Sequence, residues 1–122
     1  MKSITLKLFV LAVLIVHLST PSIHNWVKVL RDGAFREATA LAARSAAVGQ
    51  IAVCPPVNLH VVRFYLGPQR RGDAVGMKRE CSPAPVVILS GRGIAPSEEI
   101  ASAEACYPRV LARFNLVEVR AR

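Results

Sequence analysis

Aromatic and acidic residues are scarce in this sequence of 122 residues. Only 6% are Phe, Trp or Tyr, and 8 Asp and Glu stand against 16 Lys and Arg, for a formal net charge of +8. So basic a chain is expected to meet anionic partners, of which lipid headgroups and nucleic acids are the common ones. Nucleic acid is the less favoured partner, because the basic stretch 67–85 contains no aromatic residue and no nucleic-acid-binding motif is present.

Cysteine is also sparse, with three residues whose spacing gives neither a C-x-x-C pair nor a zinc-binding pattern. Cys54, Cys81 and Cys106 therefore predict no metal site. The favoured interpretation is that all three are small buried thiols. If the domain lies outside the cytoplasm, the alternative is one disulfide and one free thiol.

Residues that form a catalytic constellation are likewise missing. Ser90 follows a predicted strand but lacks the G-x-S-x-G pattern of a nucleophile elbow. The three histidines have no partners at metal-ligand spacing: His17, His24 and His60. The sequence thus predicts no catalytic residues, no metal and no cofactor, and it favours a protein that is not an enzyme.

The first 21 residues are expected to be a signal or a membrane anchor. Lys2 and Lys7 precede an apolar run over residues 8–18, which is the layout of a secretory signal. No good small-residue cleavage site follows, and the run is shorter than the roughly 20 residues of a membrane span. An uncleaved transmembrane anchor is favoured over a cleaved signal. The predicted location is a membrane or the cell envelope, with secretion as the outcome if the segment is cleaved.

Hydrophobic residues make up 52% of the chain, which is typical of helices and buried strands rather than of a disordered segment. Thr20-Pro21 is a typical helix start, and apolar or small residues then recur at helical spacing through residues 22–49. An ordinary core-facing or membrane-proximal helix is favoured over an oligomerisation face. Gly49 follows where helices commonly end in a left-handed residue.

Residues 50–122 are expected to form a small α/β domain with a basic loop at 67–85. The wholly apolar run Val86–Leu89 predicts a strand covered on both faces. The other predicted elements are a strand at 50–53, a strand at 59–66 with a short helix as the alternative, a helix over 97–114 with a kink or break at Pro108, and a strand at 116–120.

The last strand, helix and strand would form a right-handed parallel crossover. The predicted fold class is therefore α/β. It has an N-terminal apolar helix, one long helix, and then a small mixed or parallel sheet that ends in the C-terminal strand–helix–strand unit.

One turn is a candidate ligand-binding site: Ser90, Gly91, Arg92 and Gly93. It follows a predicted strand, and ligands of α/β sheets bind beyond the carboxyl ends of the strands. Glycines let the backbone approach an anion, and the arginine adds positive charge. A plain tight turn is still the favoured interpretation, because the third glycine of dinucleotide-binding loops is absent and Glu98 and Glu99 follow.

The same stretch resembles a family of bacterial envelope proteins. A strand, Ser-Gly, a Ser-Glu helix start and a strand ending in Glu118-x-Arg120 are similar to the SanA/YdcF-like family. The resemblance covers residues 86–122 and implies a shortened member, with a membrane anchor followed by an α/β domain. Residues 50–85 do not match the family's first strand and turn. Three residues would carry over to the family's site: Ser90, Gly91 and Glu98.

Two functions are expected from these observations. The first is a small membrane-anchored or exported protein with an accessory or structural role in a membrane-associated assembly, where it is held to a protein partner. The second is a shortened SanA/YdcF-like domain that binds a small anionic ligand at the 90–93 turn.

Overall fold

The structure, a computed structural model, describes residues 2–91 and 95–122, without the side chains of residues 2 and 19–32. The chain divides into two compact units, Met1–Arg31 and Asp32–Arg122.

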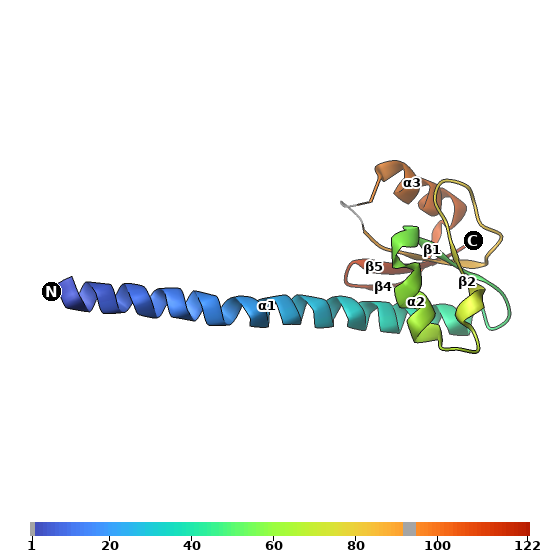
Figure 1. Cartoon of the computed structure of the whole chain (residues 1–122). Coiled ribbons are helices and arrows are strands. Elements are labelled where there is room, and N and C mark those ends of the chain that lie inside the picture. The colour runs from blue at the N-terminus through green and yellow to red at the C-terminus, as the bar shows by residue number, and fades with distance from the viewer. Residues whose placement is uncertain (1, 92–94) are drawn as a thin grey trace. The chain divides into compact units, whose positions relative to one another are not determined.

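One helix, α1 (Lys2–Ser45), makes up the first unit and continues into the second (Figure 1). Its backbone is helical through Thr20-Pro21, so the helix start predicted there is wrong. Proline holds φ near the helical value, so it is compatible with this helix at the cost of one backbone hydrogen bond.

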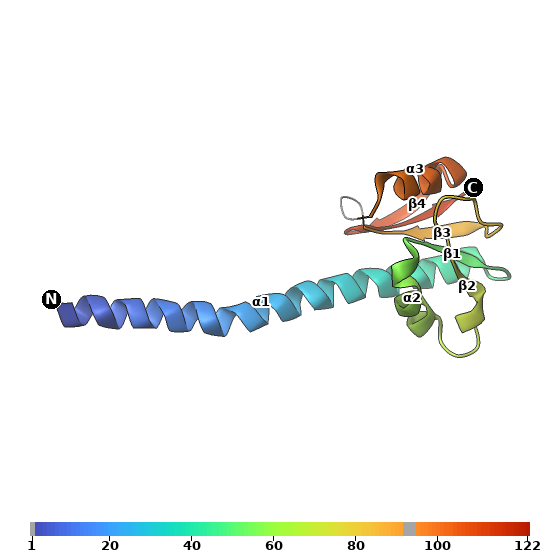
Figure 2. The same ribbon diagram turned by 45° about the horizontal axis from the view of Figure 1, so that its top comes forward.

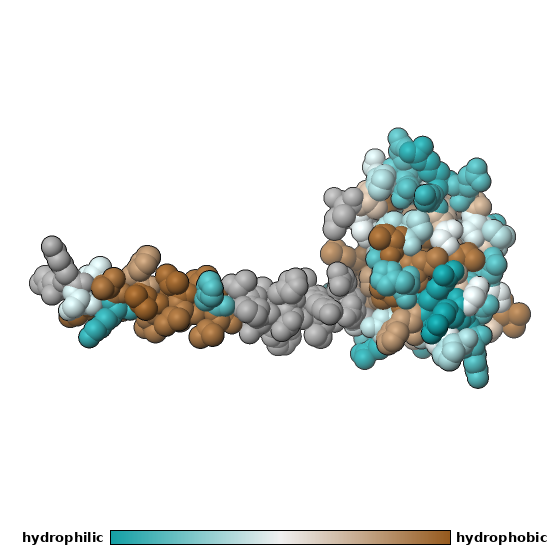
Figure 3. Space-filling model, viewed as in Figure 1, coloured by the Kyte–Doolittle hydropathy of each residue, from teal (hydrophilic) through white to brown (hydrophobic). Residues whose placement is uncertain are grey.

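The first unit exposes its apolar residues. The large hydrophobic side chains between Ile4 and Leu18 are 46% to 74% exposed, and Figure 3 shows apolar surface (brown) along this segment. Among the residues that the structure describes, no helix combines the length and the hydropathy that crossing a membrane requires. The prediction of a transmembrane helix is therefore wrong. Its uninterrupted apolar run covers only residues 8–18, whereas a span requires about 20 apolar residues.

The second unit is built on a five-stranded mixed sheet in the order β2-β1-β3-β5-β4 (Figures 1 and 2). β1 pairs in parallel with β2 and β3, whereas β5 is antiparallel to both β3 and β4. The expected α/β class is thus confirmed, and β3 has the predicted bounds. The strands are β1 (Ile51–Cys54), β2 (Ala74–Gly76), β3 (Val86–Leu89), β4 (Arg109–Phe114) and β5 (Val117–Ala121).

Helices cover both faces of this sheet (Figure 2). The end of α1 and helix α2 (Leu59–Leu66) pack on one face, called the α1 face. Helix α3 (Ser97–Cys106) packs on the opposite face, called the α3 face. Successive residues of a strand point to opposite faces, so Val53 belongs to the first core and Cys54 to the second.

Small residues let α1 approach the sheet closely. Its buried alanines recur every fourth residue, which places them on one side of the helix. They belong to the same apolar cluster as the valines and isoleucines of the sheet. This stripe is therefore a core-facing surface, as the favoured interpretation holds. The alanines are Ala34, Ala38 and Ala42 of α1 and Ala46, which follows its last residue, none of them more than 5% exposed.

Residues 59–66 form helix α2 and not the predicted strand, which confirms the alternative interpretation. Val62 is buried while Phe64 is 72% exposed, so the two do not share a buried strand face. The segment connects two parallel strands, β1 and β2, and such a connection needs a crossover rather than another strand. Gly67, with φ of 81°, ends the helix.

The predicted helix over 97–114 is shorter than expected. α3 ends at Cys106, because Pro108 disfavours the helical conformation in the residue before it, and Tyr107 has a non-helical ψ of 75°. Residues 109–114 instead form β4, which is joined to β5 by a tight turn at Asn115 with φ of 55°. Since β3 and β5 are antiparallel, the predicted parallel crossover is wrong.

The basic loop 67–85 contains the short strand β2 and has a structural role. The Arg70 guanidinium donates hydrogen bonds to the carbonyls of Ala43 (3.0 Å) and Ala46 (2.7 Å), at the carboxyl end of α1. Its Nε also pairs with the Asp73 carboxylate at 2.9 Å. A cation at this helix end complements the helix dipole and satisfies carbonyls without helical partners.

Candidate functional site

Ser90, a residue of the predicted site, lies directly beyond the carboxyl end of β3. Ser90 is 4% exposed, and its backbone N–H donates to the Cys54 carbonyl at 2.9 Å. Its hydroxyl oxygen accepts a hydrogen bond from the side-chain amide of Asn58 at 2.8 Å. Sequence reasoning missed Asn58, because only the fold brings together two residues that are 32 positions apart.

Gly91 is required by the turn itself. Its φ of +78° is one that L side chains rarely adopt, and an added Cβ would contact Ala95 (3.5 Å) and Pro55 (3.6 Å). Its carbonyl accepts a hydrogen bond from the Ala95 N–H at 2.7 Å, which closes the turn. These contacts favour the tight-turn interpretation. Arg92 and Gly93 lie outside the described residues, so the anion-binding loop stays a prediction.

The fold gives this turn a special position in the sheet. β1 and β3 are parallel neighbours. After Cys54 the chain continues to α2 on the α1 face, whereas the helix that follows Ser90 is α3 on the α3 face. Connections that leave two adjacent strands for opposite faces define a topological switch point, where ligands of α/β sheets bind. Ser90 and Gly91 therefore lie at this edge of the sheet.

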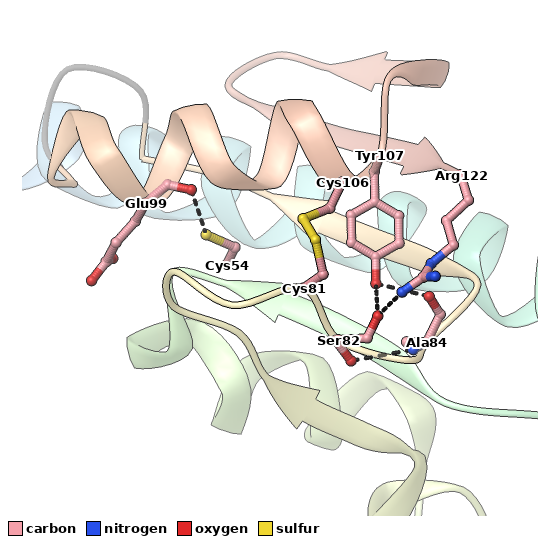
Figure 4. Close-up of a disulfide and its surroundings, with 8 residues drawn as sticks. All are labelled: Cys54, Cys81, Ser82, Ala84, Glu99, Cys106, Tyr107 and Arg122. Atoms are coloured by element: carbon pink, nitrogen blue, oxygen red, sulfur yellow. Dashed lines mark hydrogen bonds between the residues drawn. A yellow bond between two sulfur atoms is a disulfide. The ribbon is translucent and has the colours of Figure 1, made fainter.

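Cys54, at the end of β1, is a buried free thiol (Figure 4). Its Sγ–H donates to the backbone carbonyl of Glu99 at 3.8 Å. Burial, and then the charge of Glu99, raise the pKa of the Cys54 thiol from 9.0 to about 11. A thiol with this pKa is protonated at neutral pH and is not an activated nucleophile.

The other two cysteines form a disulfide that joins the loop before β3 to the end of α3 (Figure 4). The Cα atoms of Cys81 and Cys106 are 5.7 Å apart, within the usual range for a disulfide. The prediction of three buried thiols is therefore wrong, and the alternative of one disulfide and one free thiol is confirmed. The sequence spacing of the cysteines does not reveal the pairing, because the pairing depends on which segments the fold brings together.

Tyr107 follows Cys106 in the sequence and holds the same loop by hydrogen bonds (Figure 4). Its buried hydroxyl donates toward the carbonyls of Ala84 (2.8 Å) and Ser82 (3.1 Å). The Arg122 guanidinium lies 5.5 Å from the centre of the Tyr107 ring and donates to the Ser82 carbonyl. Together these contacts hold residues 82–84 against α3.

Glu118 and Arg120, the Glu-x-Arg pattern of the last strand, form an ion pair at 2.9 Å, with each side chain 9% exposed. Residues two apart on a strand share a face, so the sequence carried a signal for this pair. Arg120 also donates to the carbonyls of Tyr107 (2.7 Å) and Pro108 (3.4 Å). The pair therefore holds the turn between α3 and β4, which is a structural role.

Glu98 and Glu99 occupy the first turn of α3, as predicted. Glu98 pairs with Arg79 at 2.7 Å, and both side chains are well exposed. A shallow surface hollow nearby is lined by Glu99, Lys78, Arg79 and Glu80. Because two cations and two carboxylates balance there, the hollow favours no ligand of either sign.

The described histidines His17 and His60 are exposed and lie in different units, and the side chain of His24 is outside the description. Within the described part of the chain, no three His, Cys, Asp or Glu side chains gather to hold a metal ion.

Comparison with known proteins yields no relatives. No protein-family model, curated protein or solved structure matches this chain. The resemblance to the SanA/YdcF-like family thus rests on the motifs of residues 86–122 and stays a prediction.

Proposed function

We propose that this chain is an exported accessory protein that binds a protein partner in an oxidising compartment and performs no catalysis itself. The Cys81–Cys106 disulfide carries this proposal. Disulfides form and persist mainly in oxidising environments outside the cytoplasm. The basic start of the chain and the apolar run 8–18 supply a matching export signal.

The candidate nucleophiles of the second unit support a binding role over catalysis. The Ser90 hydroxyl is hydrogen-bonded to an amide, not to a general base, and the Cys54 thiol has a raised pKa. The buried carboxylate of Glu118 is paired with Arg120. None of these groups is arranged to transfer a proton to a substrate.

The state of the cysteines in a living cell tests export. The full chain is produced in a bacterium with a periplasm, quenched in acid, denatured and labelled with a polyethylene glycol maleimide. An exported chain has one reactive thiol, Cys54, and gains one label. A matched variant with Leu11→Arg and Leu14→Arg interrupts the export signal, stays in the cytoplasm and gains three labels.

A Cys81→Ser/Cys106→Ser variant calibrates the single-label band. Three labels on the unmodified full chain would contradict the proposal, because all cysteines would then be reduced where the protein resides.

A small anionic ligand at the Ser90-Gly91 turn is the second candidate, favoured by its place at the switch point between β1 and β3. Titration of the full chain with inorganic phosphate and pyrophosphate tests it. Saturable shifts of the Ser90 and Gly91 amide signals, weakened by Asn58→Ala, would support a ligand site. Unchanged signals would leave only the structural role of the turn.

A further inference from the structure

β4 forms an outer edge of the sheet, and within the described residues its strand partner is β5. An edge strand presents backbone N–H and C=O groups that can pair with an added strand. With six residues, β4 is also the longest strand of the sheet. Val110 and Leu111 are each 37% exposed, so apolar surface accompanies the free edge.

Positive charge flanks this edge on both sides. The register shifts between Val110 and Ala112, which leaves Leu111 as an extra, bulged residue. Because of the extra residue, Arg109 and Arg113 lie on opposite faces of the strand, and their partners on β5 are three residues apart. Both arginines are exposed, and Arg113 has a long contact of 3.7 Å to Glu118.

We propose that the β4 edge binds an extended acidic segment of a protein partner as a sixth strand of the sheet. The proposal rests on the proposed function and names the surface and the chemistry of the partner. Backbone pairing along β4 supplies affinity, and the two arginines select carboxylates. The net charge of +8 steers acidic partners towards the whole chain.

A second copy of this chain is the poorer occupant of the edge. Two paired β4 strands would bring four arginines, Arg109 and Arg113 from each copy, onto one short ladder. Like charges across paired strands are destabilising. The arginines thus act against self-association and in favour of an acidic strand.

The probe is an acetylated and amidated hexapeptide, Thr-Glu-Val-Val-Glu-Thr, whose glutamates are three residues apart and whose sequence reads the same in both directions. Added to the oxidised full chain, it should give saturable shifts of the amide signals of residues 109–114. The matched Thr-Gln-Val-Val-Gln-Thr peptide should bind about three- to tenfold more weakly, the size expected of two exposed ion pairs. A Glu peptide N-methylated at both valines should bind much more weakly, because whichever edge of the peptide faces β4 then has a methyl group in place of a central N–H donor.

Reversing the two charges on β4 provides the second part of the test. The Arg109→Glu/Arg113→Glu variant should bind the Glu peptide at least about tenfold more weakly and should bind Thr-Lys-Val-Val-Lys-Thr instead. Lys78→Glu, an equally exposed site outside the sheet, is the matched control and should change binding by less than about twofold. The peptide series remains decisive if the double variant fails to fold.

Two results would overturn the proposal: equal binding of the Glu and Gln peptides, or unchanged binding of the N-methylated peptide. Each is measured on purified oxidised protein. A failure here is therefore separate from a failure of export, which the thiol labelling reports.

Discussion

The two faces of the sheet are stabilised by different means. On the α1 face, the alanines of α1 pack against aliphatic side chains of the sheet, so apolar burial dominates. On the α3 face, α3 also packs on an apolar core, and a disulfide and the Glu118–Arg120 ion pair add covalent and electrostatic links. The stabilisation from apolar packing does not depend on the redox state of the surroundings, whereas a disulfide persists only where thiols are oxidised. The α3 face is therefore the part of this fold whose stability depends on thiol oxidation.

Breaking the buried ion pair should have the largest effect on the α3 face. In Arg120→Met, the Glu118 carboxylate loses its 2.9 Å partner and the carbonyl of Tyr107 loses its donor. We expect the free energy of unfolding to fall by about 3–5 kcal/mol, measured by denaturant unfolding. The Glu118→Leu/Arg120→Met double variant should recover most of the loss, because both members of the buried pair are then apolar. If Arg120→Met lowers the free energy of unfolding by less than about 1 kcal/mol, the Glu118–Arg120 pair does not stabilise the α3 face.

Removing the disulfide should have the next largest effect. Cys81→Ala/Cys106→Ala opens a loop closed across a sequence separation of 25 residues, and we expect a loss of about 3 kcal/mol in the free energy of unfolding. Reducing agent should destabilise the unmodified chain similarly and leave the variant unchanged. If reduction leaves the stability of the unmodified chain intact, the α3 face does not depend on its crosslink.

The sequence predicted what short-range patterns determine and missed what depends on distant partners. Val86–Leu89 is an uninterrupted apolar run, and it is β3 with those bounds. By contrast, 59–66 has the composition of a strand, and only its position between two parallel strands makes it a helix. The sequence predicts a kink or break at Pro108 within a helix over 97–114, yet residues 109–114 pair with β5 and form a strand.

The candidate site shows the same limit. The position of Ser90 beyond a strand and the need for Gly91 in a turn follow from local sequence. The hydrogen bond from Asn58 does not, because it crosses from the start of α2 to the end of β3.

Stability should fall at alkaline pH because of Cys54, on the α3 face. Its folded pKa of about 11 exceeds the ordinary value of 9.0, so as pH rises the unfolded state loses the thiol proton first. The contribution is fully present below pH 9 and is lost as pH rises through about 11. Between about pH 8 and pH 10.5 the free energy of unfolding should fall by about 2 kcal/mol more than in Cys54→Ala. Equal pH dependence of both proteins would mean that the thiol is not desolvated.

The smallest expected effect is on the α1 face. Thr39 is 1% exposed, and its Oγ1 has no hydrogen-bond partner within the described residues. Thr39→Val keeps the shape and removes the unpaired hydroxyl, so the melting temperature should rise, with a gain of about 1 kcal/mol in stability. Thr39→Ser, which keeps the hydroxyl and loses the methyl group, should lower it. A destabilised Thr39→Val would show that the Thr39 hydroxyl makes a stabilising polar contact.

Amide hydrogen exchange on the full chain, oxidised and then reduced, tests the comparison of the two faces most directly. The account predicts that reduction of Cys81–Cys106 lowers protection in α3 (Ser97–Cys106), whereas the amides of α1 from 38 to 45 keep theirs. Equal protection of α3 in both states, or an equal loss on both faces, would contradict the claim that the α3 face alone depends on an oxidising compartment.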